Sequence, residues 1–264
     1  METSIASILF YVFVGLIALE VLWAFLSKKN SYNLKDSLTN LFIIAIGKLI
    51  KPLSLLWALW LFEWAEIYRI YELPTNELVL CLTFLMVELV YYWYHRLSHE
   101  IPFLWSIHHT HHSSMWFNLT AAGRLNWFGK FISMLFYVPL VLLGFDPVLI
   151  SLSLAISLFY QFLLHTEAIG KLGVLEGIFL NTPSAHRVHH GSNPDYLDKN
   201  YGGMLILWDR IFDTYVPETE KVNYGVTTGF IGHNPLIIVF KPMVDYLKRT
   251  WQVFETDTIT KTKK

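Results

Sequence analysis

Histidines are concentrated in two short stretches of this 264-residue chain. Six of the eleven histidines lie within residues 95–112, and three more lie within residues 186–190. His95 and His99 are four residues apart, and a helix places residues three or four apart on one face. The stretches 108–112 and 186–190 both read HxxHH, which is also a helical spacing. Neutral imidazole binds zinc, copper and iron, so the pattern predicts a metal site.

The candidate ligands exceed what one metal ion can use, so we expect more than one ion. Pro102 lies between the first two sets of histidines and disfavours one unbroken helix, because proline removes a backbone donor and clashes with the preceding turn. We therefore expect two short helical ligand faces folded toward each other. The nine candidate metal ligands are His95, His99, His108, His111, His112, His165, His186, His189 and His190.

The composition indicates an integral membrane protein. Hydrophobic residues make up 54% of the chain and charged residues only 16%, and the mean hydropathy is +0.41. A soluble domain carries roughly a quarter charged residues. The net charge of −1 gives no reason to expect a nucleic acid partner. The single cysteine, Cys81, excludes an intramolecular disulfide.

The apolar segments predict an all-α membrane protein with four to five spans, at residues 5–27, 38–65, 77–94, 131–144 and 147–164. Lys48, Lys51 and Pro52 interrupt the second segment, which is either one kinked span or a shallow insertion followed by a span. Lys28 and Lys29 place the first loop in the cytoplasm by the positive-inside rule. The N-terminus is then outside, and the histidines and the C-terminus are cytoplasmic.

Residues 115–128 form an amphipathic segment rich in Trp and Phe with one arginine, Arg124. This composition fits an element at the level of the lipid headgroups, near the point where a lipid would enter. It fits an ordinary connecting helix equally well.

These strings resemble the fatty acid hydroxylase/sterol desaturase superfamily of membrane di-iron enzymes, over about residues 80–235. HRLSH at 95–99, HHTHH at 108–112 and HRVHH at 186–190 match the histidine boxes of the superfamily in order and spacing. Within it, the chain is similar to the alkylglycerol monooxygenase branch. The strings that carry this second likeness are HTE at 165–167, NTPSAHRVHHG at 181–191, DKNYGG at 198–203 and WDR at 208–210.

The resemblance implies helical membrane spans capped by a cytosolic di-metal unit. It implies two iron ions on the nine histidines, for which zinc can substitute in a purified protein, with His109 in a spacer position. It also implies O2-dependent oxidation of a lipid C–H bond. The chain then divides into membrane helices at 1–75, a fatty acid hydroxylase-type catalytic domain at 76–235 and a cytosolic tail at 236–264.

An apolar C–H bond has no acidic proton and no leaving group, so acid–base chemistry alone cannot open it, whereas O2 activated at a redox metal can. We expect the alkyl chain to lie between the spans at 77–94 and 131–164. The expected partners are a lipid, the bilayer, O2 and an external electron donor, either an electron-transfer protein or a pterin. The lipid class and the product (hydroxylated, desaturated or cleaved at an ether) stay open.

Two other classes of function also gather histidines in a membrane protein. A zinc-dependent hydrolase would be expected to carry HExxH, but position 96 is Arg. A metal transporter needs ionisable groups at membrane depth, whereas these histidines lie at span ends. Glu100, Glu167 and Asp198 are candidate hydrogen-bond acceptors for ligand N–H groups, or else solvated surface carboxylates. His233 is expected to lie in a loop rather than to bind metal.

Overall fold

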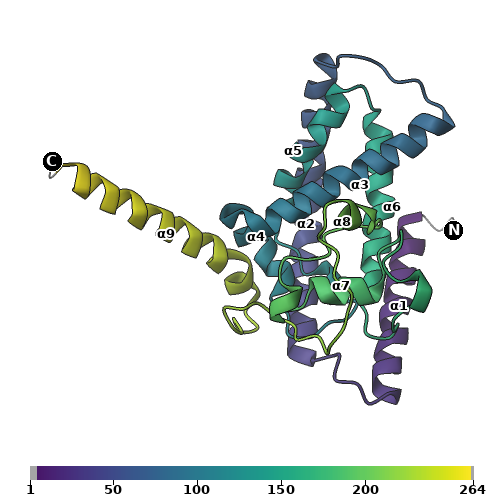
Figure 1. Cartoon of the computed structure of the whole chain (residues 1–264), viewed down its shortest axis with the longest axis vertical. Helices are drawn as coiled ribbons and strands as arrows, with labels where there is room; N and C mark the ends of the chain where they lie inside the picture. The colour runs from purple at the N-terminus through teal and green to yellow at the C-terminus, as the bar shows by residue number, and fades with distance from the viewer. Residues whose placement is uncertain (1–4, 263–264) are drawn as a thin grey trace.

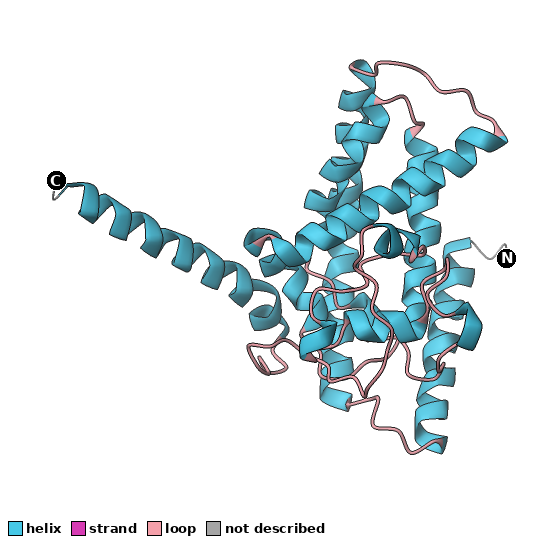
Figure 2. Ribbon diagram, viewed as in Figure 1, coloured by secondary structure: helices cyan, strands magenta, loops and turns pink. Residues whose placement is uncertain are grey.

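The computed structural model describes the backbone of residues 5–262 and the side chains of residue 8 and residues 10–253. Over this range the elements are helices joined by loops, with two isolated β-bridges, so the expected all-α fold is confirmed (Figure 1, Figure 2). The α-helices are α1 (Ile5–Leu26), α2 (Leu34–Ile67), α3 (Glu77–Glu100), α4 (Pro102–His112), α5 (Gly129–Leu142), α6 (Pro147–Leu164), α7 (Pro183–His189), α8 (Leu207–Ile211) and α9 (Pro235–Thr262). Three 3-10 helices are η1 (Ala121–Gly123), η2 (Gly173–Leu175) and η3 (Pro194–Tyr196).

Three helices of the described range, α2, α3 and α6, are long and apolar enough to cross a membrane. Two more apolar stretches, Phe10–Leu26 of α1 and Gly129–Leu142 of α5, are shorter. Only 11% of the most apolar stretch of α2 is buried inside the protein, which is costly for apolar surface unless lipid covers it. Pro52 does not interrupt the helix, because residues 38–65 lie within the single helix α2. The count of five spans stays a prediction.

The core of the membrane part lies between α2, α3, α5 and α6. Its buried residues are Phe62, Ala65, Val87, Tyr137, Leu140, Val141, Phe145 and Ile150. The indole Nε1–H of Trp57 donates to the carbonyl of Phe131 at 2.9 Å and ties α2 to α5. This packing positions α3, which carries His95 and His99, and α6, which ends directly before His165.

A tight turn between α5 and α6 aims α6 back toward the histidines. Asp146 caps α6, since its carboxylate accepts the backbone N–H of Val148 (2.6 Å) and Leu149 (3.1 Å). Gly144 has φ +98°, and a Cβ there would lie 2.2 Å from the carbonyl oxygen of Tyr71. A larger residue at position 144 would therefore push this turn off the preceding loop.

The break between the first two ligand helices falls where Pro102 predicts it. Helix α3 ends at Glu100, and Pro102 is the first residue of α4, where its missing N–H costs nothing. The third ligand helix, α7, starts with a similar device. Thr182 accepts the N–H of Ala185 on its side-chain oxygen (3.1 Å), and Pro183 occupies the first helical position.

Helix α9 begins at Pro235 and occupies most of residues 236–264, for which the sequence predicts only a cytosolic tail. Its first turns pack on the body, where Ile238 and Val239 are buried with Ile43 and Trp127. Beyond these turns the helix projects away from the other helices (Figure 1). The division of the chain into three domains stays a prediction.

Candidate metal centre

Four helices bring the nine candidate ligands to one place. Helices α3, α4 and α7 supply their histidines at helical spacings, and His165 and His190 directly follow the last residues of α6 and α7. The ring nitrogens form two groups, and within each group the ligand atoms lie within 4.8 Å of one another. The first group is His95, His99, His108, His112 and His189, and the second is His111, His165, His186 and His190.

Backbone carbonyls orient three of these imidazoles. A carbonyl only accepts hydrogen bonds, so the Nδ1 atom of each ring carries the proton and its Nε2 atom presents a lone pair. Sequence reasoning missed these acceptors, since any residue type has a carbonyl. The three Nδ1–H donors and their acceptors are His95 to Tyr201 (2.7 Å), His165 to Gln161 (2.8 Å) and His189 to Lys199 (2.9 Å).

The Nε2 atoms converge on one another. His108 Nε2 lies 3.1 Å from both His95 Nε2 and His112 Nε2. One N–H cannot donate well in both directions, whereas one cation satisfies all three lone pairs. Metal–imidazole bonds of about 2.0–2.1 Å place adjacent nitrogens about 3.0–3.4 Å apart. The second group is similar, with His165 Nε2 at 3.2 Å from His111 Nε2 and 3.1 Å from His186 Nε2.

Several buried nitrogens in the two groups have no hydrogen-bond partner among the described residues. Buried polar atoms are normally paired, so orphaned lone pairs pointing into one cluster call for a ligand. The nine residues present therefore fit metal ions. The unpartnered nitrogens on the side of the cluster are His99 Nε2, His189 Nε2 and His190 Nε2, whereas the unpartnered Nδ1 atoms of His111 and His186 belong to rings whose Nε2 atoms already converge on His165.

Burial keeps the imidazoles neutral. Removing an imidazolium from water penalises its charged form, so burial lowers the pKa of His165 to about 4. At six further histidines burial also lowers the pKa, and the neighbouring imidazoles lower it further. A neutral ring is the form that binds a metal. The pKa is lowered well below its usual value at His108, His111, His112, His186, His189 and His190.

Of the three carboxylates proposed to orient ligands, only Asp198 contacts a histidine. Its Oδ1 lies 3.3 Å from His99 Nδ1, and this hydrogen bond lowers the pKa of Asp198. Glu100 instead pairs with Arg96 at 2.7 Å on the surface. Glu167 accepts hydrogen bonds from the hydroxyls of Ser31 and Tyr224, so of the two alternatives left open for these carboxylates the ligand-orienting one fits only Asp198.

The two remaining histidines lie outside both groups. His109 packs edge-on against Trp105, with 5.6 Å between ring centroids, on the side of α4 that faces α9. His233 stacks on Trp116 in a loop, as expected. Both positions agree with the sequence prediction, in which His109 is a spacer.

The string WDR at 208–210 has a structural role beside the first group. The Asp209 carboxylate accepts the backbone N–H of Tyr201 and of Gly202, each at 2.7 Å. This holds the Tyr201 carbonyl that orients His95. Burial raises the pKa of Asp209 to about 6. Gly202 is required here, because a Cβ would lie 2.3 Å from the Leu205 carbonyl oxygen.

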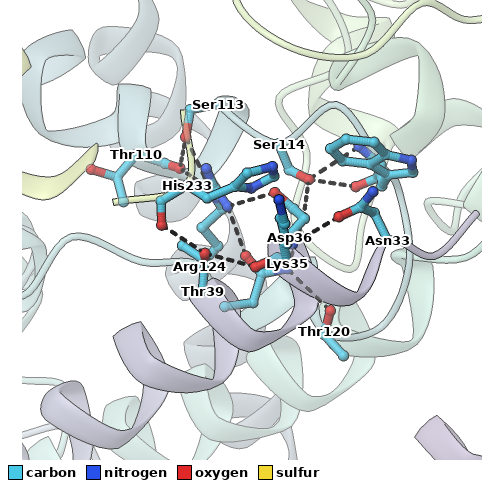
Figure 3. Close-up of polar contacts among 12 residues, drawn as sticks. Asn33, Lys35, Asp36, Thr39, Thr110, Ser113, Ser114, Thr120, Arg124 and His233 are labelled. Atoms are coloured by element: carbon cyan, nitrogen blue, oxygen red, sulfur yellow. Dashed lines mark hydrogen bonds and ion pairs between the residues drawn. The ribbon is translucent and has the colours of Figure 1, made fainter. Parts of the chain in front are cut away.

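Residues 115–128 form loops around the short η1, so the alternative of an ordinary connecting helix is wrong, and their placement at the level of the headgroups stays a prediction. Arg124 in this segment is not a surface residue. Its side chain is fully buried and pairs with Asp36 of α2 at 3.0 Å (Figure 3). The same guanidinium donates to the carbonyl of Thr110 (3.2 Å) and to Ser113 Oγ (3.0 Å), at the end of α4. These contacts hold the second histidine box to α2, and because the ion pair is buried, removing either partner would leave an uncompensated charge.

Glu20 is a buried carboxylate on α1 that ties this helix to the loops carrying Leu119 and Thr166. It accepts the hydroxyls of Tyr32 and Thr166, and the backbone N–H of Leu119 at 2.8 Å. Thr166 directly follows His165. A charged residue within an otherwise apolar segment is the signal that could have revealed this contact.

Among the described residues, two separate cavities reach the two histidine groups, and their lining residues do not overlap. The larger, about 270 Å³, touches His108, His111 and His165, and its other walls are mainly apolar residues of α3, α5 and α6. It lies between the spans at 77–94 and 131–164, where the alkyl chain is expected. The smaller, about 220 Å³, touches His99, His112, His189 and His190 and is bordered by Asp198 and loop backbone.

Comparison with known proteins agrees with this geometry. A sequence profile described as "Fatty acid hydroxylase" matches residues 80–214, which is half of the chain and contains all nine candidate ligands. The chain belongs to the fatty acid hydroxylase family. No solved structure matches it.

Individual relatives are lipid-modifying enzymes by name. Alkylglycerol monooxygenase of Xenopus tropicalis is 40% identical over 247 residues, which cover 92% of this chain and 54% of that protein. The human alkylglycerol monooxygenase is 39% identical over 246 residues, 90% of this chain and 54% of that protein. An ornithine lipid hydroxylase of Rhizobium tropici is 33% identical over 150 residues, 54% of this chain and 44% of that protein. The chain thus spans about half the length of these relatives.

Proposed function

We propose that this chain is a membrane-bound, O2-dependent lipid hydroxylase whose nine histidines hold two iron ions. The observation that carries the proposal is the junction of the two histidine groups with the larger cavity. His108 belongs to the first group, and His111 and His165 belong to the second, and all three border that cavity. A substrate in the cavity would therefore lie beside both metal positions.

The cavity suits an alkyl chain. Leu154, Leu158, Gln161, Phe162 and His165 all line it and are spaced along one side of α6. At 1.5 Å per residue the wall from Leu154 to His165 is about 16 Å long. The mainly apolar lining would exclude water and hold the chain with one carbon near the histidines, which positions the bond to be oxidised.

Iron, when bound, supplies the O2 chemistry that side chains lack. The overall reaction inserts one oxygen atom into a C–H bond, while two electrons and two protons reduce the other oxygen atom to water. The electrons come from an external donor, an electron-transfer protein or a pterin. The chain's own contribution is to orient the imidazoles through Tyr201, Gln161, Lys199 and Asp198, and to keep them neutral.

The names of the relatives favour a glycerolipid with an ether-linked alkyl chain as the first substrate to test. We also propose that the histidines face the cytoplasm, on the basis of Lys28 and Lys29 in the first loop. Cysteines introduced at Asn76 and Lys263 are expected to be labelled from opposite sides of the membrane.

The test uses the full chain in nanodiscs, loaded with iron and supplied with reductant. Alkylglycerol, a fatty acyl lipid and a sterol are offered separately, and O2 consumption and oxidised product are measured together with iron per chain. We expect two iron ions per chain and product from at least one lipid. Full activity with one iron ion would refute the two-metal centre, and O2-independent hydrolysis of a lipid would refute the hydroxylase.

A further inference from the structure

Helix α9 has one apolar face that the described part of the chain leaves uncovered. Leu236, Ile237, Phe240, Val244 and Leu247 are each between 39% and 61% exposed. At about 100° per residue these five side chains fall within about 100° of the helix circumference. A continuous apolar stripe of this kind is not a stable surface in water.

The opposite face of α9 packs against the body. Ile238 and Val239 are fully buried, and the hydroxyl of Thr110 on α4 donates to the Ile238 carbonyl at 3.3 Å. The amide of Asn126 donates to the Val239 carbonyl at 2.9 Å. These contacts fix the rotation of the helix, so the apolar stripe is directed outward and the far half projects from the body (Figure 1).

Charged side chains border the stripe on the other sides of the helix. Lys241 forms an ion pair with Asp245, which leaves Lys248 and Arg249 as additional exposed cations. Lysine and arginine beside an apolar helix face are typical of helices that lie in the interface of a bilayer with anionic lipids. Their long side chains reach headgroup phosphates while their stems stay apolar.

The stripe also continues into the membrane part of the protein. The Phe240 ring packs edge-on against Trp127 (5.7 Å between centroids) and Phe128 (6.0 Å). Phe128 is itself 39% exposed and directly precedes α5. The neighbouring Leu125 and Asn126 line the larger cavity. The apolar face of α9 thus adjoins the place where α5 begins and where the cavity is bordered by loop residues.

We infer that α9 is an interfacial anchor that lies on the lipid surface, with its apolar stripe in the boundary between headgroups and acyl chains and its cations on anionic headgroups. The occupant of the stripe is the bilayer that surrounds the other helices. Because α9 is tied to Asn126 and Phe128, its anchoring holds the loop beside the cavity at the depth of the lipid headgroups.

The test measures depth by fluorescence quenching in nanodiscs and needs no catalysis. The background is Cys81→Ser, since Cys81 is the only cysteine. A fluorophore is attached to Leu247→Cys on the stripe or, as the matched control, to Arg249→Cys. Position 249 is two residues further along the chain than position 247, which places them about 200° apart around the helix. Lipids with a nitroxide near the headgroup quench from the bilayer, and iodide quenches from water.

We expect the ratio of nitroxide to iodide quenching to be at least about threefold higher at position 247 than at 249. Raising the share of phosphatidylglycerol should increase nitroxide quenching at 247, and this increase should shrink in Lys248→Gln. Equal iodide quenching at both positions would place the stripe in water. Shielding of position 247 from both quenchers would mean that protein, such as a second copy, covers it. Either result overturns the inference.

A second pair of positions guards against a local disturbance at 247. Val244→Cys lies on the stripe, and Asp245→Cys lies next to it in the sequence but about 100° away on the helix. The same difference in quenching is expected, with position 244 favouring the nitroxide. An absence of contrast in this pair, in variants with unchanged helical circular dichroism, also contradicts the inference.

Discussion

Two buried polar clusters lie on opposite sides of α4, and they differ in where their positive charge comes from. Thr110 and Ser113 face the Asp36–Arg124 pair, in which both side chains are fully buried (Figure 3). His108, His111 and His112 face the two histidine groups. In the first cluster a guanidinium from the chain neutralises the carboxylate. In the second, neutral lone pairs converge and the described residues supply no such cation.

The difference shows what marks a ligand site among buried polar groups. The carboxylate of Asp36 is bonded by Arg124, by the amide of Asn40 (3.2 Å) and by the hydroxyl of Ser114 (2.7 Å). In the histidine cluster, the Nε2 atoms of His99, His189 and His190 are buried, have no hydrogen-bond partner among the described residues and lie on the side of the cluster. Burial alone is therefore uninformative, whereas burial combined with converging unpaired acceptors indicates a bound ion.

The largest expected effect comes from removing a converging lone pair. His111→Gln and His189→Gln should each lose a metal ion and lower lipid oxidation by more than about 100-fold, since even groups that only orient ligands are worth 10–100-fold. Bound metal and product formation are measured side by side. The matched control is His109→Gln on the same helix, which should keep both metal ions and a sizeable share of activity. Equal metal loss in His109→Gln and His111→Gln would mean that the ligand register of α4 is wrong.

Breaking the other cluster should affect folding instead. Arg124→Met leaves the Asp36 carboxylate buried without its cation, which costs about 3–5 kcal/mol of unfolding free energy. Chemical unfolding in detergent measures this loss. The double variant Asp36→Asn/Arg124→Met removes the buried charge and should recover part of it. For comparison, Arg69→Met removes a partly exposed arginine that pairs with Glu66 and Glu72, and should cost less than about 1 kcal/mol.

The same contrast explains what the sequence can predict. The histidine spacings predict shared ligand faces, because helical periodicity puts His95 and His99, or His108 and His112, on one side of a helix, but they do not predict how the nine residues divide into two groups. Pro102 likewise predicts the break between α3 and α4, since its effect is local. Both inferences depend only on residues close together in the chain.

Contacts between distant residues were not predictable in this way. Arg124 reads as a surface arginine in an amphipathic segment, and only the fold shows that Asp36, 88 residues away, lies beside it. The carbonyl of Tyr201 orients His95 across 106 residues, and a carbonyl has no signature in the sequence. For Glu167 the residue type was suitable, but the fold directs its side chain to Ser31, which is 136 residues away.

A smaller effect is expected at Asp198, the carboxylate that contacts His99 of the histidine cluster. Asp198→Asn keeps an oxygen near His99 Nδ1 but removes the negative charge that strengthens the hydrogen bond. Metal affinity should fall by about 10-fold, at the low end for groups that orient ligands, because this carboxylate is 64% exposed. Competition with a chelator measures the affinity. Asp195→Asn, an exposed neighbour, is the control, and equal changes in both would indicate a general charge effect.

The smallest expected effect tests a single unpaired atom. The Tyr137 hydroxyl is buried without a hydrogen-bond partner among the described residues, and Tyr137 lines the larger cavity. Tyr137→Phe should raise the unfolding free energy of the substrate-free protein by up to about 1 kcal/mol, because an unsatisfied donor is removed. It should also raise KM about fivefold for a lipid with an oxygen along its chain, with kcat little changed, because that oxygen loses its donor.

Tyr160→Phe is the matched control for this orphan hydroxyl. The Tyr160 hydroxyl donates to the Asn181 carbonyl at 2.7 Å, so the same substitution there should destabilise by about 1 kcal/mol. If the two substitutions change the unfolding free energy in opposite directions, the Tyr137 hydroxyl serves a ligand and not the fold. If Tyr137→Phe destabilises as Tyr160→Phe does, the hydroxyl is already satisfied within the resting protein. Its orphan status would then carry no information about the lipid, in contrast to the converging nitrogens of the histidines.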